Sequence, residues 1–156
     1  MAMILIVNGP NLNLLGSREP ELYGDMTLEQ INNELAELAK ELGLEVKFFQ
    51  SNSEGGLIDY LHEHAPEADG LIINPGAYTH YSIAIRDAIA GLNLVAIEVH
   101  LTNTQAREKI RKKSVIAPVC KGVLAGFGGY GYAMALSYFS GLVTGDEDQQ
   151  NDDISK

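Results

Sequence analysis

The fold is decided by Met3-Ile4-Leu5-Ile6-Val7, an unbroken apolar run that Asn8-Gly9-Pro10 ends abruptly. An apolar run without alternation is typical of a strand that is covered on both faces. Asparagine, glycine and proline favour turns, so the strand should end near Asn8. This opening predicts a buried strand of a parallel sheet.

The rest of the chain alternates between helical and strand patterns. Apolar residues recur at helical spacing over 28–42, where Thr27 and Gln30 form a capping box and Gly43 ends the helix. Further helices are predicted at 54–64, 82–90, 104–112 and 132–142, and further strands at 46–50, 70–74, 94–100 and 122–125. Five strands alternating with five helices indicate right-handed βαβ units in an α/β fold. We predict a flavodoxin-like, doubly wound, five-stranded parallel sheet of order 2-1-3-4-5.

The length and charge of the chain limit its organisation and its partners. With 156 residues there is room for one domain, which we place at residues 1–144. Residues 145–156 are acidic and almost free of apolar side chains, so a disordered tail is expected there. The net charge of −10 argues against a nucleic acid or an anionic membrane as a partner, because phosphate groups need a basic surface.

Cysteine and histidine are too sparse to suggest a metal site. Cys120 is the single cysteine of the sequence, which fits a reducing compartment, and its apolar neighbours favour an inert thiol. The four histidines show no metal-ligand spacing. The apolar run at 3–7 is too short for a signal peptide or a membrane span, so the expected location is the cytoplasm.

Polar residues follow three of the predicted strands at the point where each strand ends. They occupy 8–13 after the first strand, 74–80 after the third and 98–103 at the end of the fourth. In doubly wound sheets, ligands bind beyond the carboxyl ends of the strands. By itself, either Asn8-Gly9-Pro10 or Asn74-Pro75-Gly76 is better explained as an ordinary turn. The three together favour a binding or catalytic site.

Glu98 and His100 form the most specific pair in the sequence. They lie two residues apart on an apolar strand, so both side chains point to the same face, roughly 6.5–7 Å apart along it. A carboxylate buried in such a strand is costly unless a partner binds it. The imidazole can be that partner, and the carboxylate would make the histidine a usable acid or base. A purely structural ion pair is the alternative.

The segment from 9 to 26 is long for a connection between a strand and a helix, which normally takes about 2–6 residues. It contains Arg18 and Tyr23 between glycines, as lids over active sites often do. If Arg18 lies against Tyr23, its charge favours the phenolate and lets the tyrosine act as a base. An ordinary surface loop is the alternative.

Two further patterns are weaker. Residues 126–131 match the GxGxxG pattern of dinucleotide-binding proteins, but too little chain follows for the second half of such a unit. We therefore predict a tight turn there, and no cofactor. The basic residues within 109–113 are interpreted as a solvated helix face.

Several motifs together resemble the type II 3-dehydroquinate dehydratases. The segment from Asn8 to Gly24 is similar to the opening motif of that family. Asn74-Pro75-Gly76-Ala77-Tyr78-Thr79-His80 and Glu98-Val99-His100-Leu101 resemble two further motifs in the expected order. Ala106-Arg107-Glu108 with Arg111 and Ser114, and the glycine-rich turn before the last helix, resemble two more. The resemblance extends over about residues 3–143.

The resemblance implies an enzyme that converts 3-dehydroquinate to 3-dehydroshikimate by anti elimination of water through an enolate, without a Schiff base. On this basis Tyr23 removes the C2 proton and Arg18 favours its phenolate. Asn13 holds the water that stabilises the enolate oxygen. His100 protonates the departing C1 hydroxyl, and Glu98 orients the ring.

The same resemblance implies a set of substrate-binding residues and an assembly. The substrate contacts are expected from Asn74, His80, Leu101, Thr102 and Arg111, where Thr102 replaces the usual serine but keeps the hydroxyl. Asp87 is expected to reach the site of a neighbouring subunit. The family forms homododecamers, built as tetramers of trimers.

Two other classes of protein share the expected fold. A flavodoxin-like cofactor protein would carry a phosphate-binding loop after the first strand, and a receiver module would carry acidic residues there. This sequence has asparagine, proline and leucine at that position. A non-enzymatic protein that inherited the fold is the second alternative, and the presence of Arg18 and Tyr23 argues against it.

Overall fold

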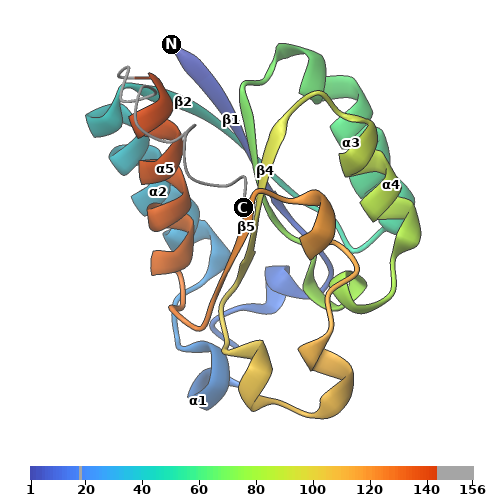
Figure 1. The fold of residues 1–156 in the computed structure, drawn as a ribbon. Helices are drawn as coiled ribbons and strands as arrows, with labels where there is room; N and C mark the ends of the chain where they lie inside the picture. The colour runs from blue at the N-terminus through green and yellow to red at the C-terminus, as the bar shows by residue number, and fades with distance from the viewer. Residues whose placement is uncertain (18, 144–156) are drawn as a thin grey trace, which may run out of the picture.

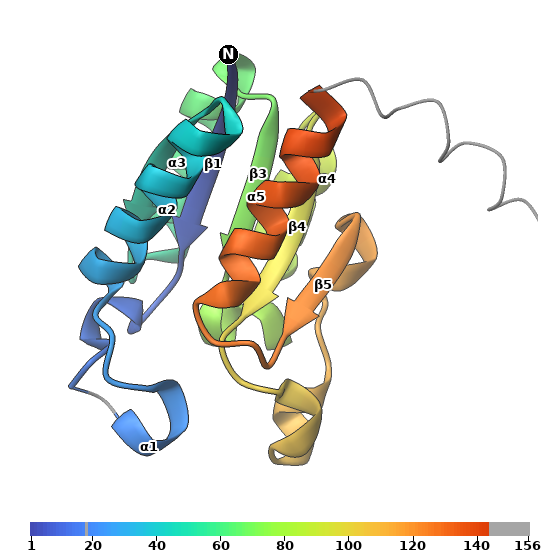
Figure 2. The ribbon, with the colours of Figure 1, turned by 90° about the vertical axis from the view of Figure 1, so that its left-hand side faces the viewer.

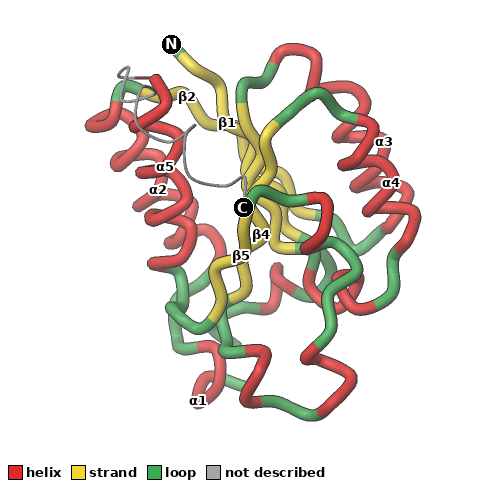
Figure 3. Tube along the Cα trace, in the orientation of Figure 1, coloured by secondary structure: helices red, strands yellow, loops and turns green. Residues whose placement is uncertain are grey.

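The computed structural model describes residues 1–17 and 19–143 of the chain. The tail expected at 145–156 lies outside the described residues. Figure 1 shows a central twisted sheet between two layers of helices, and Figure 3 shows the same arrangement by secondary structure. Among the described residues, no helix has both the length and the apolar composition that crossing a bilayer requires.

Over residues 1–17 and 19–143, the sheet has five strands, all paired in parallel. They are β1 (Ala2–Asn8), β2 (Leu44–Gln50), β3 (Gly70–Asn74), β4 (Val95–His100) and β5 (Gly122–Ala125). Their order in the sheet is β2-β1-β3-β4-β5, with every neighbouring pair parallel. The predicted flavodoxin-like order 2-1-3-4-5 is therefore confirmed.

In the described part of the chain, five α-helices and six short 3₁₀ helices connect or follow the strands. The α-helices are α1 (Pro20–Tyr23), α2 (Leu28–Leu42), α3 (Glu54–His64), α4 (Ile83–Gly91) and α5 (Tyr130–Val143). The 3₁₀ helices span Leu12–Leu14, Ala65–Glu67, Gly76–His80, Thr104–Ala106, Lys109–Lys112 and Ala117–Val119. Figures 1 and 2 show α2 and α5 on one face of the sheet and α3 and α4 on the other.

Strand β1 is buried on both faces, as its unbroken apolar run predicts. Ile4 and Ile6 pack into the core under α2 and α5, whereas Leu5 and Val7 pack into the core under α3 and α4. All four side chains are at most 1% exposed. Apolar residues on both faces are what a central parallel strand needs, since helices cover each side.

Helix α2 begins and ends where the sequence indicates. The Thr27 hydroxyl accepts a hydrogen bond from the Gln30 amide at 3.1 Å, and the Gln30 side chain accepts one from the Thr27 amide at 2.8 Å. Gly43 follows in a left-handed conformation, with φ of 72°. The predicted capping box and glycine end are both confirmed.

The helix predicted at 104–112 is wrong. The structure has two separate 3₁₀ helices in this range, because Arg107 and Glu108 adopt extended backbone conformations between them. The Asn103 side chain accepts a hydrogen bond from the Gln105 backbone amide, and the Gln105 side chain donates a hydrogen bond to the Lys112 carbonyl. These bonds fold the segment into a compact loop, which Figure 1 shows below β4. The basic residues therefore lie on a loop instead of along one helix face.

Gly70 allows α5 to pack closely against the middle of the sheet. A Cβ atom at this position would lie 2.4 Å from the Phe139 ring. Phe139 is 2% exposed, so its ring has little room to move away. The missing side chain at Gly70 thus fixes how near α5 lies to β3.

We predict that Gly70→Ala lowers the free energy of unfolding by about 1–3 kcal/mol, because the added methyl overpacks this contact. Gly122→Ala is a matched control in a strand of the same sheet, since a Cβ there meets nothing within 4 Å. The control should change stability by less than about 1 kcal/mol. Denaturant unfolding of both variants checks the difference, and equal stabilities would contradict the packing argument.

Candidate active site

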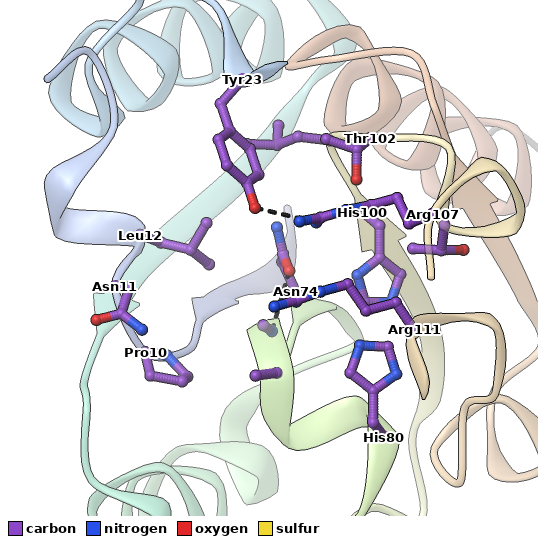
Figure 4. A pocket seen from close by; sticks show the side chains of 14 residues that line it. Pro10, Asn11, Leu12, Tyr23, Asn74, His80, His100, Thr102, Arg107 and Arg111 are labelled. Carbon is purple, nitrogen blue, oxygen red and sulfur yellow. Dashed lines mark hydrogen bonds between the residues drawn. The ribbon is translucent and has the colours of Figure 1, made fainter. Parts of the chain in front are cut away.

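A cavity opens where β1, β3 and β4 end at their carboxyl edges. The register aligns Asn8 with Asn74 and Ile73 with Glu98, so the polar residues after each strand meet at one edge. Figure 4 shows side chains from several elements converging there. The cavity is lined by Pro10, Asn11, Leu12, Tyr23, Asn74, Gly76, Ala77, His80, His100, Leu101, Thr102, Thr104, Arg107 and Arg111.

Most of the residues that the sequence nominates come together at this cavity. Its lining includes Tyr23, Asn74, His80, His100, Leu101, Thr102 and Arg111. Glu98 is buried directly behind His100. Asn13 and Asp87 are exposed and are not among the lining residues. Arg18 lies outside the described residues, so its expected contact with Tyr23 stays a prediction.

The Glu98–His100 pair has the geometry that their spacing predicts. His100 Nε2 lies 2.8 Å from Glu98 Oε2, and the two residues are 8% and 1% exposed. A carboxylate oxygen accepts, so Nε2 carries a proton and donates to Glu98. The ring is thereby oriented, and Nδ1 is left as the nitrogen that can exchange a proton with a molecule in the cavity.

Ser114 holds the second oxygen of Glu98. Its hydroxyl donates to Glu98 Oε1 at 2.7 Å, and Thr79 Oγ1 lies 2.9 Å from the Ser114 oxygen. The backbone amides of Ile116 and Ala117 also donate hydrogen bonds to Ser114 Oγ, at 3.1 and 2.9 Å. Both oxygens of a carboxylate that is 1% exposed are thus hydrogen-bonded, which makes its burial tolerable.

Tyr23 meets an arginine that the sequence does not single out. Arg107 Nη1 donates to the Tyr23 hydroxyl at 3.0 Å, and the guanidinium carbon lies 5.7 Å from the centre of the ring. Figure 4 shows this bond at the top of the cavity. Arg107 is 84 residues from Tyr23 in sequence and lies outside the basic run at 109–113. In the sequence, Arg107 is indicated only by its place in the Ala106-Arg107-Glu108 motif.

Asn11, in the loop after β1, is the asparagine of that loop that lines the cavity. Its backbone is left-handed, with φ of 67°, and its backbone N–H donates a hydrogen bond to Asn52 Oδ1 at 3.0 Å. The Asn13 side chain is directed elsewhere and lies 3.5 Å from Gln50 Nε2. The sequence pattern does not show which of the two asparagines lines the cavity, because the chain turns into a 3₁₀ helix between them.

Arg111 and His80 are held in place at the opposite wall. Arg111 donates through Nε to Glu108, and His80 Nδ1 lies 2.8 Å from the Lys113 carbonyl. A backbone hydrogen bond at Glu108 and the adjacent Arg111 lower the pKa of the Glu108 carboxyl. Glu108 therefore remains an ionised partner for Arg111 at neutral pH.

The cavity is cationic although the chain as a whole is acidic. Arg107 and Arg111 line it, and no aspartate or glutamate is among its described lining residues. Arginine and histidine side chains recognise carboxylate and hydroxyl oxygens. The lining therefore suits a small anionic molecule that carries oxygen acceptors.

Cys120 is not placed for nucleophilic chemistry. Burial, and to a smaller extent the charge of Glu98, raise the pKa of its thiol to about 12. The thiol therefore stays protonated at neutral pH. Within residues 1–17 and 19–143, no group of three or more histidine, cysteine or acidic side chains is placed to hold a metal ion.

Comparisons with known proteins identify the family of the chain. The family model described as dehydroquinase class II matches residues 2–140. The chain belongs to this family. The match also sets aside the flavin-binding and receiver alternatives, which are different families that share the fold.

Named relatives cover nearly the whole chain. The 3-dehydroquinate dehydratase of Pelotomaculum thermopropionicum is 58% identical over 133 residues, covering 85% of this chain and 92% of the relative. That of Bacillus licheniformis is 53% identical over 139 residues, covering 89% and 96%.

Solved structures with the same architecture come from two further organisms. The type II dehydroquinase of Butyrivibrio crossotus has a TM-score of 0.86 at 47% identity, covering 88% of this chain and 96% of that one. The type II dehydroquinase of Propionibacterium acnes has a TM-score of 0.87 at 42% identity, covering 90% and 97%.

We predict that Ser114→Ala lowers the free energy of unfolding by about 1–3 kcal/mol, because Glu98 loses a hydroxyl donor in a buried position. Ser137→Ala is the control, since that hydroxyl is exposed and donates only along its own helix, to the Ala133 carbonyl. Denaturant unfolding measures both. If the two variants lose the same stability, Ser114 does not support the buried carboxylate.

Proposed function

We propose that this chain is a 3-dehydroquinate dehydratase, a hydro-lyase that converts 3-dehydroquinate to 3-dehydroshikimate in the shikimate pathway. The family model and the named relatives support the reaction class. One structural observation carries the mechanism. A tyrosine beside an arginine and a histidine beside a buried carboxylate line the same cationic cavity.

The first step is removal of a proton next to the substrate carbonyl. Tyr23 acts as the base and takes the C2 proton. The electron pair of the C–H bond then forms a double bond between C2 and the carbonyl carbon, and the carbonyl π pair moves onto the oxygen to give an enolate. Arg107 donates a hydrogen bond to the phenolic oxygen, which stabilises negative charge on it. Arg18 is proposed to add a second positive charge from the loop.

The enolate oxygen needs a hydrogen-bond donor within the cavity. The family resemblance gives this role to Asn13, acting through a water molecule. The position of the side chains favours Asn11 instead, since Asn11 lines the cavity and Asn13 does not. We therefore assign the water-holding amide to Asn11.

The last step expels the C1 hydroxyl. The enolate collapses to form the C1–C2 double bond, and the C1–O bond breaks as His100 transfers a proton to the leaving oxygen, which departs as water. Glu98 stabilises the imidazolium form of His100 and fixes the ring. No electron is gained or lost overall, so the reaction requires no redox cofactor.

The remaining lining residues hold the substrate. We assign its carboxylate and hydroxyl groups to Asn74, His80, Arg111, Thr102 and the backbone at Leu101. Arg111 is anchored by Glu108, so it can offer its other N–H groups to the ligand without losing its position.

We also propose the assembly and setting that the family resemblance implies. The catalytic unit is residues 1–144, and the enzyme forms a homododecamer as a tetramer of trimers in the cytoplasm. Asp87 lies exposed on α4, outside the cavity of its own chain, as a residue that serves a neighbouring subunit must.

The proposed activity is tested by mixing the purified protein with 3-dehydroquinate in a buffer that contains a metal chelator. The ultraviolet absorbance of the conjugated enone product should rise, and borohydride added with substrate should not inactivate the enzyme. Rapid loss of activity with borohydride would instead indicate a Schiff-base intermediate, and no absorbance change would refute the function.

Replacing Tyr23 tests the base. Tyr23→Phe should lower turnover by about 10²–10⁴-fold, the usual contribution of a general base, while 3-dehydroquinate still binds. Arg107→Lys should retain more activity than Arg107→Ala, because it keeps the charge but loses the planar fork. Steady-state rates and a binding titration measure these effects. A Tyr23→Phe enzyme with normal turnover would move the base to another residue.

A matched pair of asparagine variants tests the enolate contact. Asn11→Gly should lower kcat by up to about 10²-fold, because it removes the amide while glycine accepts the left-handed backbone. Asn13→Gly should leave kcat close to that of the wild type. The reverse order of effects would return the role to Asn13.

A further inference from the structure

Three polar side chains are buried beneath the floor of the cavity, on the face of the sheet that α2 and α5 cover. Asn8 ends β1, Asn74 ends β3, and Tyr132 reaches them from α5. They are 1%, 2% and 0% exposed. Polar groups so deeply buried are costly unless they are hydrogen-bonded, and these bond to one another.

The hydrogen bonds in this cluster run in one direction. The Gly76 backbone amide can only donate, and it donates to Asn74 Oδ1 at 3.1 Å. Asn74 therefore turns Nδ2 toward Tyr132 and donates to its hydroxyl oxygen at 3.0 Å. The Tyr132 hydrogen is then free for Asn8 Oδ1, to which it donates. Burial raises the pKa of Tyr132, so the hydroxyl keeps its proton.

This chain of bonds fixes one of the substrate-binding side chains. Asn74 lines the cavity, and an asparagine amide can present either oxygen or nitrogen by rotating about its last bond. Gly76 holds the oxygen and Tyr132 holds one N–H, so rotation would break both contacts. The remaining N–H is the donor that Asn74 can offer to an oxygen of the bound ligand.

We propose that Tyr132, through its hydroxyl, is a positioning residue that holds Asn74 in this donor orientation for substrate binding. Tyr132 is not among the residues that line the cavity, so it acts through Asn74. The inference rests on the proposed function, in which Asn74 binds 3-dehydroquinate.

The neighbouring Asn8 makes the tyrosine hydroxyl necessary. Asn8 and Asn74 are register partners on adjacent strands, roughly 5 Å apart, and their side chains share a face. Asn8 Nδ2 is buried without a hydrogen-bond partner in the described part of the chain. Without the hydroxyl between them, the two amides would pair with each other, which draws the Asn74 nitrogen away from the ligand.

The packing of α5 against the sheet sets the distance of Tyr132 from the end of β3. Phe139 lies two turns further along the same helix and packs over Gly70 at the start of β3, whereas Asn74 ends that strand. Tyr132 and Phe139 belong to the same core cluster. One strand therefore contacts the helix at both ends, once through packing and once through hydrogen bonds.

The test compares Tyr132→Phe with Tyr138→Phe, the same chemical change on the same helix at a residue that does not line the cavity. Tyr132→Phe should raise KM for 3-dehydroquinate roughly 3–10-fold, as loss of one ligand hydrogen bond does. Its kcat and pH profile should stay close to wild type, because the Tyr23 and His100 contacts are untouched. Tyr138→Phe should change neither constant.

A double variant distinguishes positioning from general loss of structure. If Tyr132 acts through Asn74, then Tyr132→Phe adds no further rise in KM to Asn74→Ala. Asn8→Ala, which removes the acceptor of the hydroxyl and keeps the ring, should raise KM by a smaller factor. It supplies the test if Tyr132→Phe does not fold.

The outcomes separate this inference from the proposed function. A wild-type enzyme that does not convert 3-dehydroquinate refutes the function itself. A wild-type enzyme that does, combined with an unchanged KM in Tyr132→Phe and Asn8→Ala, overturns the positioning role. Effects of Tyr132→Phe and Asn74→Ala that multiply in the double variant overturn it as well.

Discussion

The parallel register of β1, β3 and β4 is the constraint on which the rest of the structure depends. These strands are covered on both faces along their length, so polar side chains become tolerable only where the strands end. Because all three run in the same direction, their polar ends lie at one edge of the sheet. The cavity is the consequence of that alignment, and its lining comes from segments that are distant in sequence.

The alternation of side chains along these strands gives the cavity two different supports. On the α3 and α4 side, Glu98 is held by Ser114 and in turn orients His100. On the α2 and α5 side, Tyr132 holds Asn74. In the mechanism that we propose, the first network bears on proton transfer and the second on substrate binding. Each contact is short and buried, so neither part can shift without leaving a polar atom unpaired.

Local patterns predict what depends on local spacing, and little else. The Glu98–His100 pair follows from the two-residue period of a strand, and the α2 ends follow from Thr27 and Gly43. The contact between Tyr23 and Arg107 cannot be predicted from local spacing, because a loop with two short 3₁₀ helices brings Arg107 back over the cavity. Likewise, whether Asn11 or Asn13 faces the cavity depends on one left-handed residue. Such details are set by tertiary contacts and not by periodicity.

The charge distribution adds a further argument about the ligand. The chain carries a net charge of −10, whereas the described lining of the cavity holds Arg107 and Arg111 and no acidic residue. At physiological ionic strength, surface charges are screened beyond about 8 Å, so an anion is attracted only once it is close to the opening. Inside, the arginines are less screened, and each is held by a partner, Tyr23 or Glu108. Selection for a small carboxylate therefore takes place in the cavity itself, and the acidic surface disfavours large polyanions.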